Sequence, residues 1–366
     1  MDFDLSDDAR TLREAARKFL EAEAGPAVAR RAMNGDAPHD AALWAKVVEQ
    51  GWPAARVPER FGGLGLGADE ACVLAEEVGR SLAPVPLLST MAVIEALLVA
   101  GTEAQQSEWL PKLGSGAAIG ALAWAEGARS PAQMPATRLA DGRLTGTKAP
   151  VADGLSATVA VVTVATPDGP AMALAPLQQK GVTVAPAETL DLVRRSATLE
   201  FDGAAAEPLG TALDWVTVSE RLAVLHAWEA LGTAAAAMAM TLAYAKERSA
   251  FGLRIGRYQA VKHRLADMYI KGELARAHAM HGCWAWGANA PELGQTAAAA
   301  RLASLDALRF TAEESVQLHG GIGFTWEHDC QLYYRRARQV SAALGSRAHW
   351  ADRLVRALEL RNRAAA

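Results

Sequence analysis

The order of its secondary-structure patterns is the feature that most constrains how this chain folds. Apolar residues recur at helical spacing between Ser6 and Ala24, and helical spacing returns from Trp215 to the end. Between about residues 119 and 208 the pattern changes to short β-branched runs and turn dipeptides. Segregated blocks exclude an alternating βαβ nucleotide-binding fold. We expect an α+β chain with an α-helical domain at 1–117, a middle antiparallel β domain at 118–208 and an α-helical domain at 209–366.

Three short segments shape the expectation for the middle block. Asp141-Gly142 lies between two alternating runs and predicts a hairpin turn, because both residues tolerate positive φ. The run from Ala157 to Thr166 predicts a strand. Ala204 to Pro208 has the composition of a linker that leads out of the sheet.

Composition excludes several classes of protein. A chain of 366 residues is too long for one ordinary core, and 51% hydrophobic with 21% charged residues excludes a disordered chain. Lys and Arg number 37 against 41 Asp and Glu, a net charge of −4, and no basic tract is present. We therefore expect no nucleic-acid partner.

The cysteines and histidines predict neither disulfides nor a metal centre. Three cysteines far apart make neither a disulfide framework nor a paired-cysteine zinc motif, which favours a reducing cytoplasm. His278 and His281 lie one helical turn apart near Cys283, but nothing supplies a further ligand. We expect a surface or interface histidine pair and no metal.

Nothing in the sequence predicts a membrane protein. The N-terminus is acidic and lacks the charged-then-apolar order of a signal peptide. The most apolar stretch, Leu222 to Ala245, is mostly alanine and is interrupted by His226, Glu229 and Gly232. We expect a buried helix there and no membrane span.

A first candidate site follows the helix that ends near Arg248. Arg248 can grip a pyrophosphate with both guanidinium nitrogens, Phe251 can cover a flat ring, and Gln259 can hydrogen-bond the polar edge of a cofactor. The alternative is a helix–helix corner with a solvated arginine.

A second candidate site is the glycine-rich segment after Gln317. Gly320 and Gly321 permit close approach of the backbone to a ligand, and the Gln317 amide can donate and accept hydrogen bonds. The alternative is a glycine C-cap followed by a turn.

Taken together, these segments resemble the acyl-CoA dehydrogenase family over essentially the whole chain. Arg248-x-x-Phe-Gly252 and Gln317-x-x-Gly-Gly-x-Gly-Phe324 resemble its two C-terminal signatures. The segments that resemble its N-terminal helical domain are Met1-Asp-Phe-Asp-Leu-Ser6, Val57 to Leu66, Glu76-Glu-Val-Gly-Arg80 and Trp109-Leu-Pro-Lys-Leu113.

The resemblance implies a fold, a cofactor and a reaction. It implies a C-terminal four-helix bundle, FAD, an acyl-CoA substrate, an electron-transfer flavoprotein or similar acceptor, and a homo- or hetero-oligomer built as a dimer of dimers. In the family a glutamate takes the α-proton and the flavin accepts the β-hydride, a reaction of fatty acid or steroid degradation. The residues implied to reach the neighbour's FAD are Arg248, Phe251, Gln259, Gln317, Gly320 and Gly321.

Two segments of the middle domain, which in the family contact the chain's own flavin, depart from the family pattern. Ala125 to Pro131 stands where the family has an acidic loop that ends in Ser-Asp. Lys148 to Asp153 stands where it has a Trp-Ile-Ser/Thr turn. The resemblance therefore does not carry these two flavin contacts over to this chain.

The family's catalytic glutamate is also missing from its two usual positions. The resemblance places it at Leu344 or at Leu222, and neither is a carboxylate. Glu229 lies two helical turns after Leu222, on about the same face, and is the candidate base. The alternative for Glu229 is a buried carboxylate paired with a neighbour.

These departures lead to one main hypothesis and three others. The main hypothesis is one subunit of a heteromeric acyl-CoA dehydrogenase whose partner supplies the base. The others are a self-sufficient homo-oligomeric dehydrogenase, a flavin-dependent oxidase or monooxygenase on the same fold, and a redox-silent partner subunit.

Overall fold

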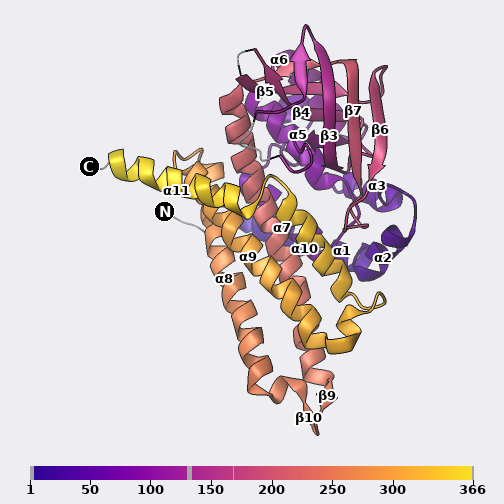
Figure 1. The fold of residues 1–366 in the computed structure, drawn as a ribbon, viewed down its shortest axis with the longest axis vertical. Helices are drawn as coiled ribbons and strands as arrows, with labels where there is room; N and C mark the ends of the chain where they lie inside the picture. The colour runs from indigo at the N-terminus through magenta and orange to yellow at the C-terminus, as the bar shows by residue number, and fades with distance from the viewer. Residues whose placement is uncertain (1–3, 130–133, 168, 365–366) are drawn as a thin grey trace. The chain divides into compact units, whose positions relative to one another are not determined.

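The structure is a computed structural model that describes residues 4–129, 134–167 and 169–364 (Figure 1). It divides into two compact units. One unit comprises Met1–Arg31, Cys72–Ala83 and Ala223–Ala366, and the other comprises Ala32–Ala71 and Pro84–Leu222.

The unit that contains the sheet begins with short helices. Thr102 and Gln105 form a capping box at the start of α6, because each side chain accepts from the other residue's main-chain N–H. The helix α5 (Leu87–Ala100) is mostly apolar and contacts β1 (Gly120–Ala123) and β4 (Val159–Thr166), and it is buried from Leu87 to Leu97. The helices of this unit are α3 (Ala41–Glu49), η1 (Glu59–Phe61), α5 (Leu87–Ala100) and α6 (Glu103–Gly114).

An eight-stranded sheet forms the rest of this unit. Seven strands follow the order β6-β7-β3-β2-β4-β5-β8, and β1 pairs with β4. All pairs are antiparallel except β1–β4 and β2–β4, which are parallel. The strands are β1 (Gly120–Ala123), β2 (Arg138–Ala140), β3 (Arg143–Ala152), β4 (Val159–Thr166), β5 (Gly169–Pro176), β6 (Val182–Ala187), β7 (Ser196–Ala205) and β8 (Glu207–Leu209).

The predicted hairpin at Asp141-Gly142 is present. Asp141 and Gly142 have φ of 49° and 69°, and Ala140 pairs with Arg143, as in a two-residue turn of the I′ type. The predicted linker from Ala204 to Pro208 is wrong, because β7 continues to Ala205 and β8 begins at Glu207. Pro208 fits there because β8 is an edge strand and has one side without a hydrogen-bonded neighbour.

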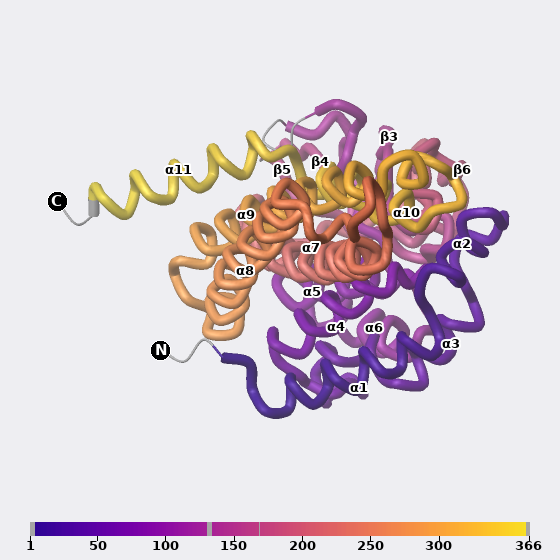
Figure 2. The backbone as a smooth tube through the Cα atoms, turned by 90° about the horizontal axis from the view of Figure 1, so that it is seen from below, coloured from indigo at the N-terminus to yellow at the C-terminus, as the bar shows by residue number. Residues whose placement is uncertain are grey.

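The other unit is helical. Its bundle has a small-residue core in which alanines of α7 pack against α9 and α10, and Trp228 Nε1 on α7 donates to Ala279 O on α8 over 3.2 Å. Figure 2 shows α7, α8 and α9 side by side, with α11 running out from them. The helices that lie wholly or mostly in this unit are α1 (Asp7–Glu23), α2 (Pro26–Asn34), α4 (Ala68–Ser81), α7 (Ala212–Glu247), α8 (Gln259–Gly287), α9 (Leu293–His319), α10 (Cys330–Ala342) and α11 (Arg347–Ala364).

The long helix α7 meets the length and hydropathy of a membrane span. However, 72% of its apolar window is buried inside the protein, which is typical of a core helix. This agrees with the sequence-based expectation for Leu222 to Ala245.

The α+β fold class predicted from the sequence is confirmed: helices, then a sheet, then helices. The two parallel pairings were not predicted, because strand periodicity does not reveal direction. The boundaries at 117/118 and 208/209 remain a prediction. Met1 to Phe3 lie outside the described residues.

Candidate functional site

The first candidate segment forms a small hairpin at the end of α7. Arg248 follows α7 and is exposed, and β9 (Ser249–Ala250) pairs with β10 (Leu253–Arg254). Phe251 and Gly252 form the turn with φ of 53° and 82°. A bulky residue at positive φ is strained, and such strain is found mainly at functional sites. The turn leaves the Phe251 side chain 98% exposed, so its ring is available to a ligand.

Two side chains fix this hairpin on the bundle. Arg254 Nη1 donates to Lys246 O over 2.7 Å and to Glu247 O over 3.1 Å, which satisfies carbonyls at the C-terminus of α7. Tyr258 Oη donates to Ala250 O over 2.8 Å. Gln259 then begins α8 and is exposed. These hydrogen bonds order the segment between α7 and α8, which presents Arg248, Phe251 and Gln259 to solvent.

The second candidate segment is a glycine turn at the end of α9. Gln317 is exposed in the last turn of α9, and η3 (Gly320–Phe324) follows. Gly320 has φ of 63° and ψ of −140°, a conformation that is essentially restricted to glycine. A Cβ atom at Gly320 or Gly321 would meet nothing within 4 Å, so the backbone there is open to a ligand.

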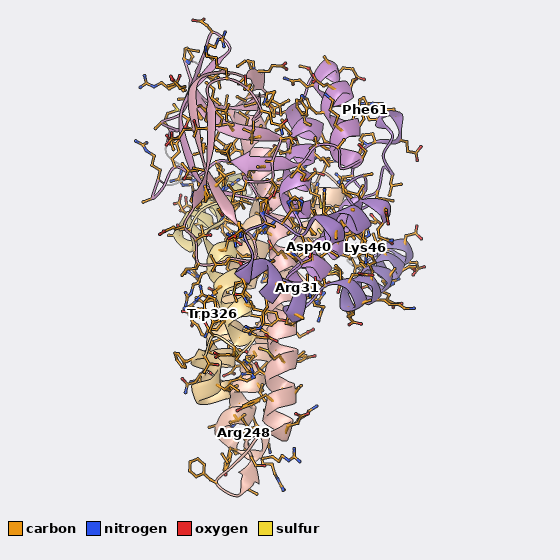
Figure 3. The ribbon with its side chains drawn as sticks, turned by 90° about the vertical axis from the view of Figure 1, so that its right-hand side faces the viewer. Arg31, Asp40, Lys46, Phe61, Arg248 and Trp326 are labelled. Carbon is orange, nitrogen blue, oxygen red and sulfur yellow. The ribbon has the colours of Figure 1, made fainter. Side chains whose placement is uncertain are left out.

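A ring contact joins the two segments. The ring of Tyr244, one turn before Arg248, stacks on that of His319, next to Gly320, with centroids 4.3 Å apart. Both segments consequently lie toward one end of the bundle, and Figure 3 shows Arg248 at its tip. This ring contact links the two segments that carry the six residues implied to contact a neighbour's flavin, and all six belong to one unit.

His319, His328 and Cys330 cluster beneath the glycine turn, and their ligand-type atoms lie within 4.8 Å of one another. The nearest atoms are already used in hydrogen bonds. His319 Nδ1 lies 2.7 Å from Ser315 O, and His328 Nδ1 accepts from Cys330 N over 3.2 Å. Burial raises the pKa of the Cys330 thiol to about 11, which disfavours the thiolate that metals require. The cluster is best described as packing that supports the turn.

Glu229 lies in the interior of the bundle and apart from the other candidates. Its side chain is fully buried, with Oε2 2.8 Å from His226 Nδ1 and Oε1 3.6 Å from Arg336 Nη1. Eighteen residues of α7 lie between it and Arg248, which is about 28 Å along the helix. This arrangement matches the alternative of a buried, paired carboxylate.

The two positions at which the resemblance places the family's glutamate hold buried leucines. Leu222 is fully buried on α7. Leu344 is 3% exposed and has φ of 57°, next to Gly345 at φ of 101°. Neither side chain can accept a proton.

The two departing segments of the β unit lie side by side. Ala149 N donates to Ala125 O over 2.9 Å, and Gly127 N donates to Ala149 O over 2.8 Å. Residues 149–152, at the end of β3, are Ala-Pro-Val-Ala, so this part of the strand offers no hydroxyl or indole to a flavin. Ser130 and Pro131 lie outside the described residues.

A buried ion pair that sequence analysis missed joins the same segments. Lys148 Nζ lies 2.7 Å from Glu126 Oε1 and 2.9 Å from Thr163 Oγ1. Burial lowers the pKa of Lys148 to about 8, although Glu126 opposes that shift. Burial alone would raise the pKa of Glu126, but hydrogen bonds from Lys148 and from main-chain amides lower it to about 2. The available signal was Lys148 itself, a charged residue on β3, a strand whose side chains alternate between buried and exposed.

Comparison with known proteins identifies the family. The model of the acyl-CoA dehydrogenase N-terminal domain matches residues 6–117, and that of the acyl-CoA dehydrogenase C-terminal domain matches residues 188–358. The chain belongs to the acyl-CoA dehydrogenase family.

Individual acyl-CoA dehydrogenases are similar over nearly the whole chain. Acyl-CoA dehydrogenase IpdE2 of Mycolicibacterium smegmatis is 34% identical over 342 residues, covering 93% of this chain and 96% of the relative. The ChsE4-ChsE5 complex from Mycobacterium tuberculosis contains a chain with a TM-score of 0.90 and 28% identity, covering 98% of this chain and 99% of that chain. A variant of the steroid ACAD Tcur3481-Tcur3483 has a TM-score of 0.90 and 29% identity over the same shares.

Family membership confirms the predicted FAD-dependent acyl-CoA dehydrogenase function. The structure tests which parts of the chain fit the cofactor. The exposed end of the bundle fits, because the backbone at Gly320 and Gly321 is open and Phe251 is free of packing. The end of β3 at residues 149–152 does not offer the side-chain groups that the family pattern uses.

Proposed function

We propose that this acyl-CoA dehydrogenase chain is one subunit of a heteromeric enzyme and that its partner supplies the catalytic base. One observation carries the proposal: both positions for the base are buried leucines, Leu222 and Leu344, whereas the end of the bundle that would serve a neighbour is built and exposed. A chain that carries only the neighbour-facing half of a flavin site can work only beside a different chain that carries the other half.

Glu229, the candidate base, is poorly suited to proton abstraction. A general base must reach the proton that it takes, and Glu229 is fully buried beside His226 and Arg336. Protonation of Glu229 would remove the negative charge that the Arg336 guanidinium balances. We assign Glu229 a structural role in this proposal.

The exposed end of the bundle supplies binding and orientation. The Arg248 guanidinium is suited to the pyrophosphate of a dinucleotide, and Gln259 and Gln317 offer amide hydrogen bonds to its polar edges. Phe251 covers a ring, and the bare backbone at Gly320 and Gly321 admits a phosphate or ribose. When bound, FAD supplies the hydride acceptor of the reaction.

The relatives suggest the wider context. The ChsE4-ChsE5 complex supports a hetero-oligomer, which we expect to be a heterotetramer built as a dimer of dimers. The steroid ACAD among the similar structures supports a steroid CoA thioester as the substrate class. We further propose an electron-transfer flavoprotein or similar acceptor and a cytoplasmic location.

One experiment tests the proposal. The chain is purified alone and with its co-expressed relative, and flavin per subunit and bleaching by an acyl-CoA are measured. We expect little flavin and no bleaching alone, and less than one flavin per subunit with full bleaching in the complex. Full flavin occupancy and bleaching by the chain alone would overturn the proposal.

Two further measurements separate the alternatives. Loss of activity in a folded Glu229→Gln variant would favour the self-sufficient enzyme. Rapid reoxidation by oxygen with a hydroxylated product would favour an oxidase or monooxygenase. A complex whose activity is unchanged by Arg248→Ala would favour a redox-silent subunit.

A further inference from the structure

An arginine from the N-terminal part of the chain holds the segment that follows the glycine turn. Arg30 lies on α2, and its Nη1 donates to the main-chain oxygen of Trp326 over 2.8 Å. Its Nε lies 2.8 Å from Asp329 Oδ1, and its Nη2 lies 2.7 Å from the same oxygen. One guanidinium therefore clamps two points of residues 326–329, and both contacts lie within one compact unit.

The clamped segment is continuous with the open turn. Gly320 and Gly321 are exposed, and Phe324 and Trp326 are 75% and 44% exposed, so little packing holds this stretch from outside. Within the bundle, Gln331 Nε2 donates to Gly323 O over 2.8 Å, and the Arg335 guanidinium lies 4.6 Å from the centre of the Trp326 ring. Both of those contacts come from α10, whereas Arg30 comes from a different part of the chain.

We propose that Arg30 is a positioning residue for the glycine turn. By fixing Trp326 O and the Asp329 carboxylate, it limits the conformations open to residues 320–329 and holds the backbone at Gly320 and Gly321 in the shape that a dinucleotide meets. The identity of that dinucleotide rests on the proposed function, but the clamp itself does not.

The chemistry of arginine explains why this role suits it. A planar guanidinium makes several hydrogen bonds in fixed directions, while a lysine ammonium is a point charge on a flexible stem. Arg30→Lys keeps the charge and loses the geometry. It therefore separates a positioning role from a general electrostatic one.

The first test follows amide hydrogen exchange in the full chain without cofactor. We expect Arg30→Ala to accelerate exchange at residues 320–329 by at least about tenfold, and Arg30→Lys to recover only part of the protection. Arg31→Ala is the matched control, because Arg31 is the next residue on α2 and is exposed. If Arg30→Ala and Arg31→Ala exchange alike in this segment, the proposal is wrong. Arg30→Gln replaces Arg30→Ala if the latter does not fold.

The second test measures FAD affinity of the complex with the co-expressed relative by flavin fluorescence. We expect Arg30→Ala to weaken binding at least fivefold with the melting temperature within a few degrees of the parent, and Arg31→Ala to leave binding unchanged. Equal FAD affinity in all variants would overturn the positioning role and leave the proposed function intact. If no variant, nor the parent complex, binds FAD, the proposed function fails while the exchange experiment still decides the clamp.

Discussion

Gly232 on α7 lies directly against the main-chain carbonyl of Glu76 on α4, with no room between them for a Cβ atom. Gly79 on α4 meets the main chain of Glu229 in the same way, and Thr233 Oγ1 donates to Gly79 O over 3.0 Å. The two helices therefore cross at their backbones, and this crossing depends on two glycines.

A methyl group at the crossing is expected to be costly. We expect Gly232→Ala to lower the free energy of unfolding by at least about 2 kcal/mol, because the helices must separate to admit it. Urea denaturation of the full chain measures this. Gly272→Ala on α8 is the control, since a Cβ atom there meets nothing within 4 Å and should raise stability by about 0.5–1 kcal/mol. Equal stability of the two variants would refute the close packing.

Removal of Lys148 should destabilise the β unit. Lys148→Met removes the nearer cation of the Glu126 carboxylate, which is 8% exposed, and leaves only Arg129 Nε at 4.0 Å, so we expect a loss of about 3 kcal/mol. Adding Glu126→Gln should restore part of that loss, because no charge then remains unpaired. Lys180→Met, at an exposed lysine of the same unit, is expected to change the unfolding midpoint little. A similar loss at both lysines would contradict the prediction.

The histidines beneath the glycine turn predict a pH dependence. Burial lowers the pKa of His319 and His328 below 6.5, so the folded state favours the neutral rings. The unfolded chain then binds more protons as pH falls below 6.5, and stability falls with it. His319→Phe keeps a ring to stack on Tyr244 but cannot take a proton, so we expect a smaller loss of melting temperature between pH 7 and pH 5. The same change at the exposed His263 is the control, and an equal effect there would refute this assignment.

Two substitutions at Phe251, in the turn of the hairpin, separate the effect of backbone strain from the effect of ligand contact. Phe251→Ala and Phe251→Gly both remove the ring, so both are expected to weaken FAD binding by the complex. Only glycine relieves the backbone strain at φ of 53°, and we expect Phe251→Gly to be more stable than Phe251→Ala by about 1 kcal/mol. Flavin fluorescence and thermal denaturation of both variants check this. Unchanged FAD affinity would contradict a contact role for the ring.

Local patterns in the sequence predicted the local structure well. Asp141-Gly142 specifies its turn through the conformations that those two residues tolerate, and helical spacing predicted most of the helices. The prediction of a linker at Ala204 to Pro208 was wrong because alanine has almost no preference for β-strands and because an edge strand tolerates a proline. Motif spacing also predicted a loop after Arg248 and a glycine turn after Gln317, and both are present; the contacts of these residues with FAD stay a prediction.

Contacts between residues far apart in the sequence could not be predicted from local sequence patterns. Nothing near Glu229 in the sequence indicates Arg336, and nothing near Arg30 indicates Asp329, because tertiary packing alone brings these charges together. The character of Glu229 as a paired acid could be stated as an alternative but not decided. For the same reason, the ring stack of Tyr244 on His319 was not predicted.

The anchoring of the hairpin by Arg254 and Tyr258 has a thermodynamic consequence for association. These hydrogen bonds order the turn within the folded chain, so its conformational entropy is lost during folding and not during binding. A molecule that docks on Phe251 therefore meets a preorganised surface. Little of the binding energy is then consumed in ordering the loop. Differences in affinity between such molecules should come chiefly from the quality of their contacts with this surface, and they should appear in the dissociation rate.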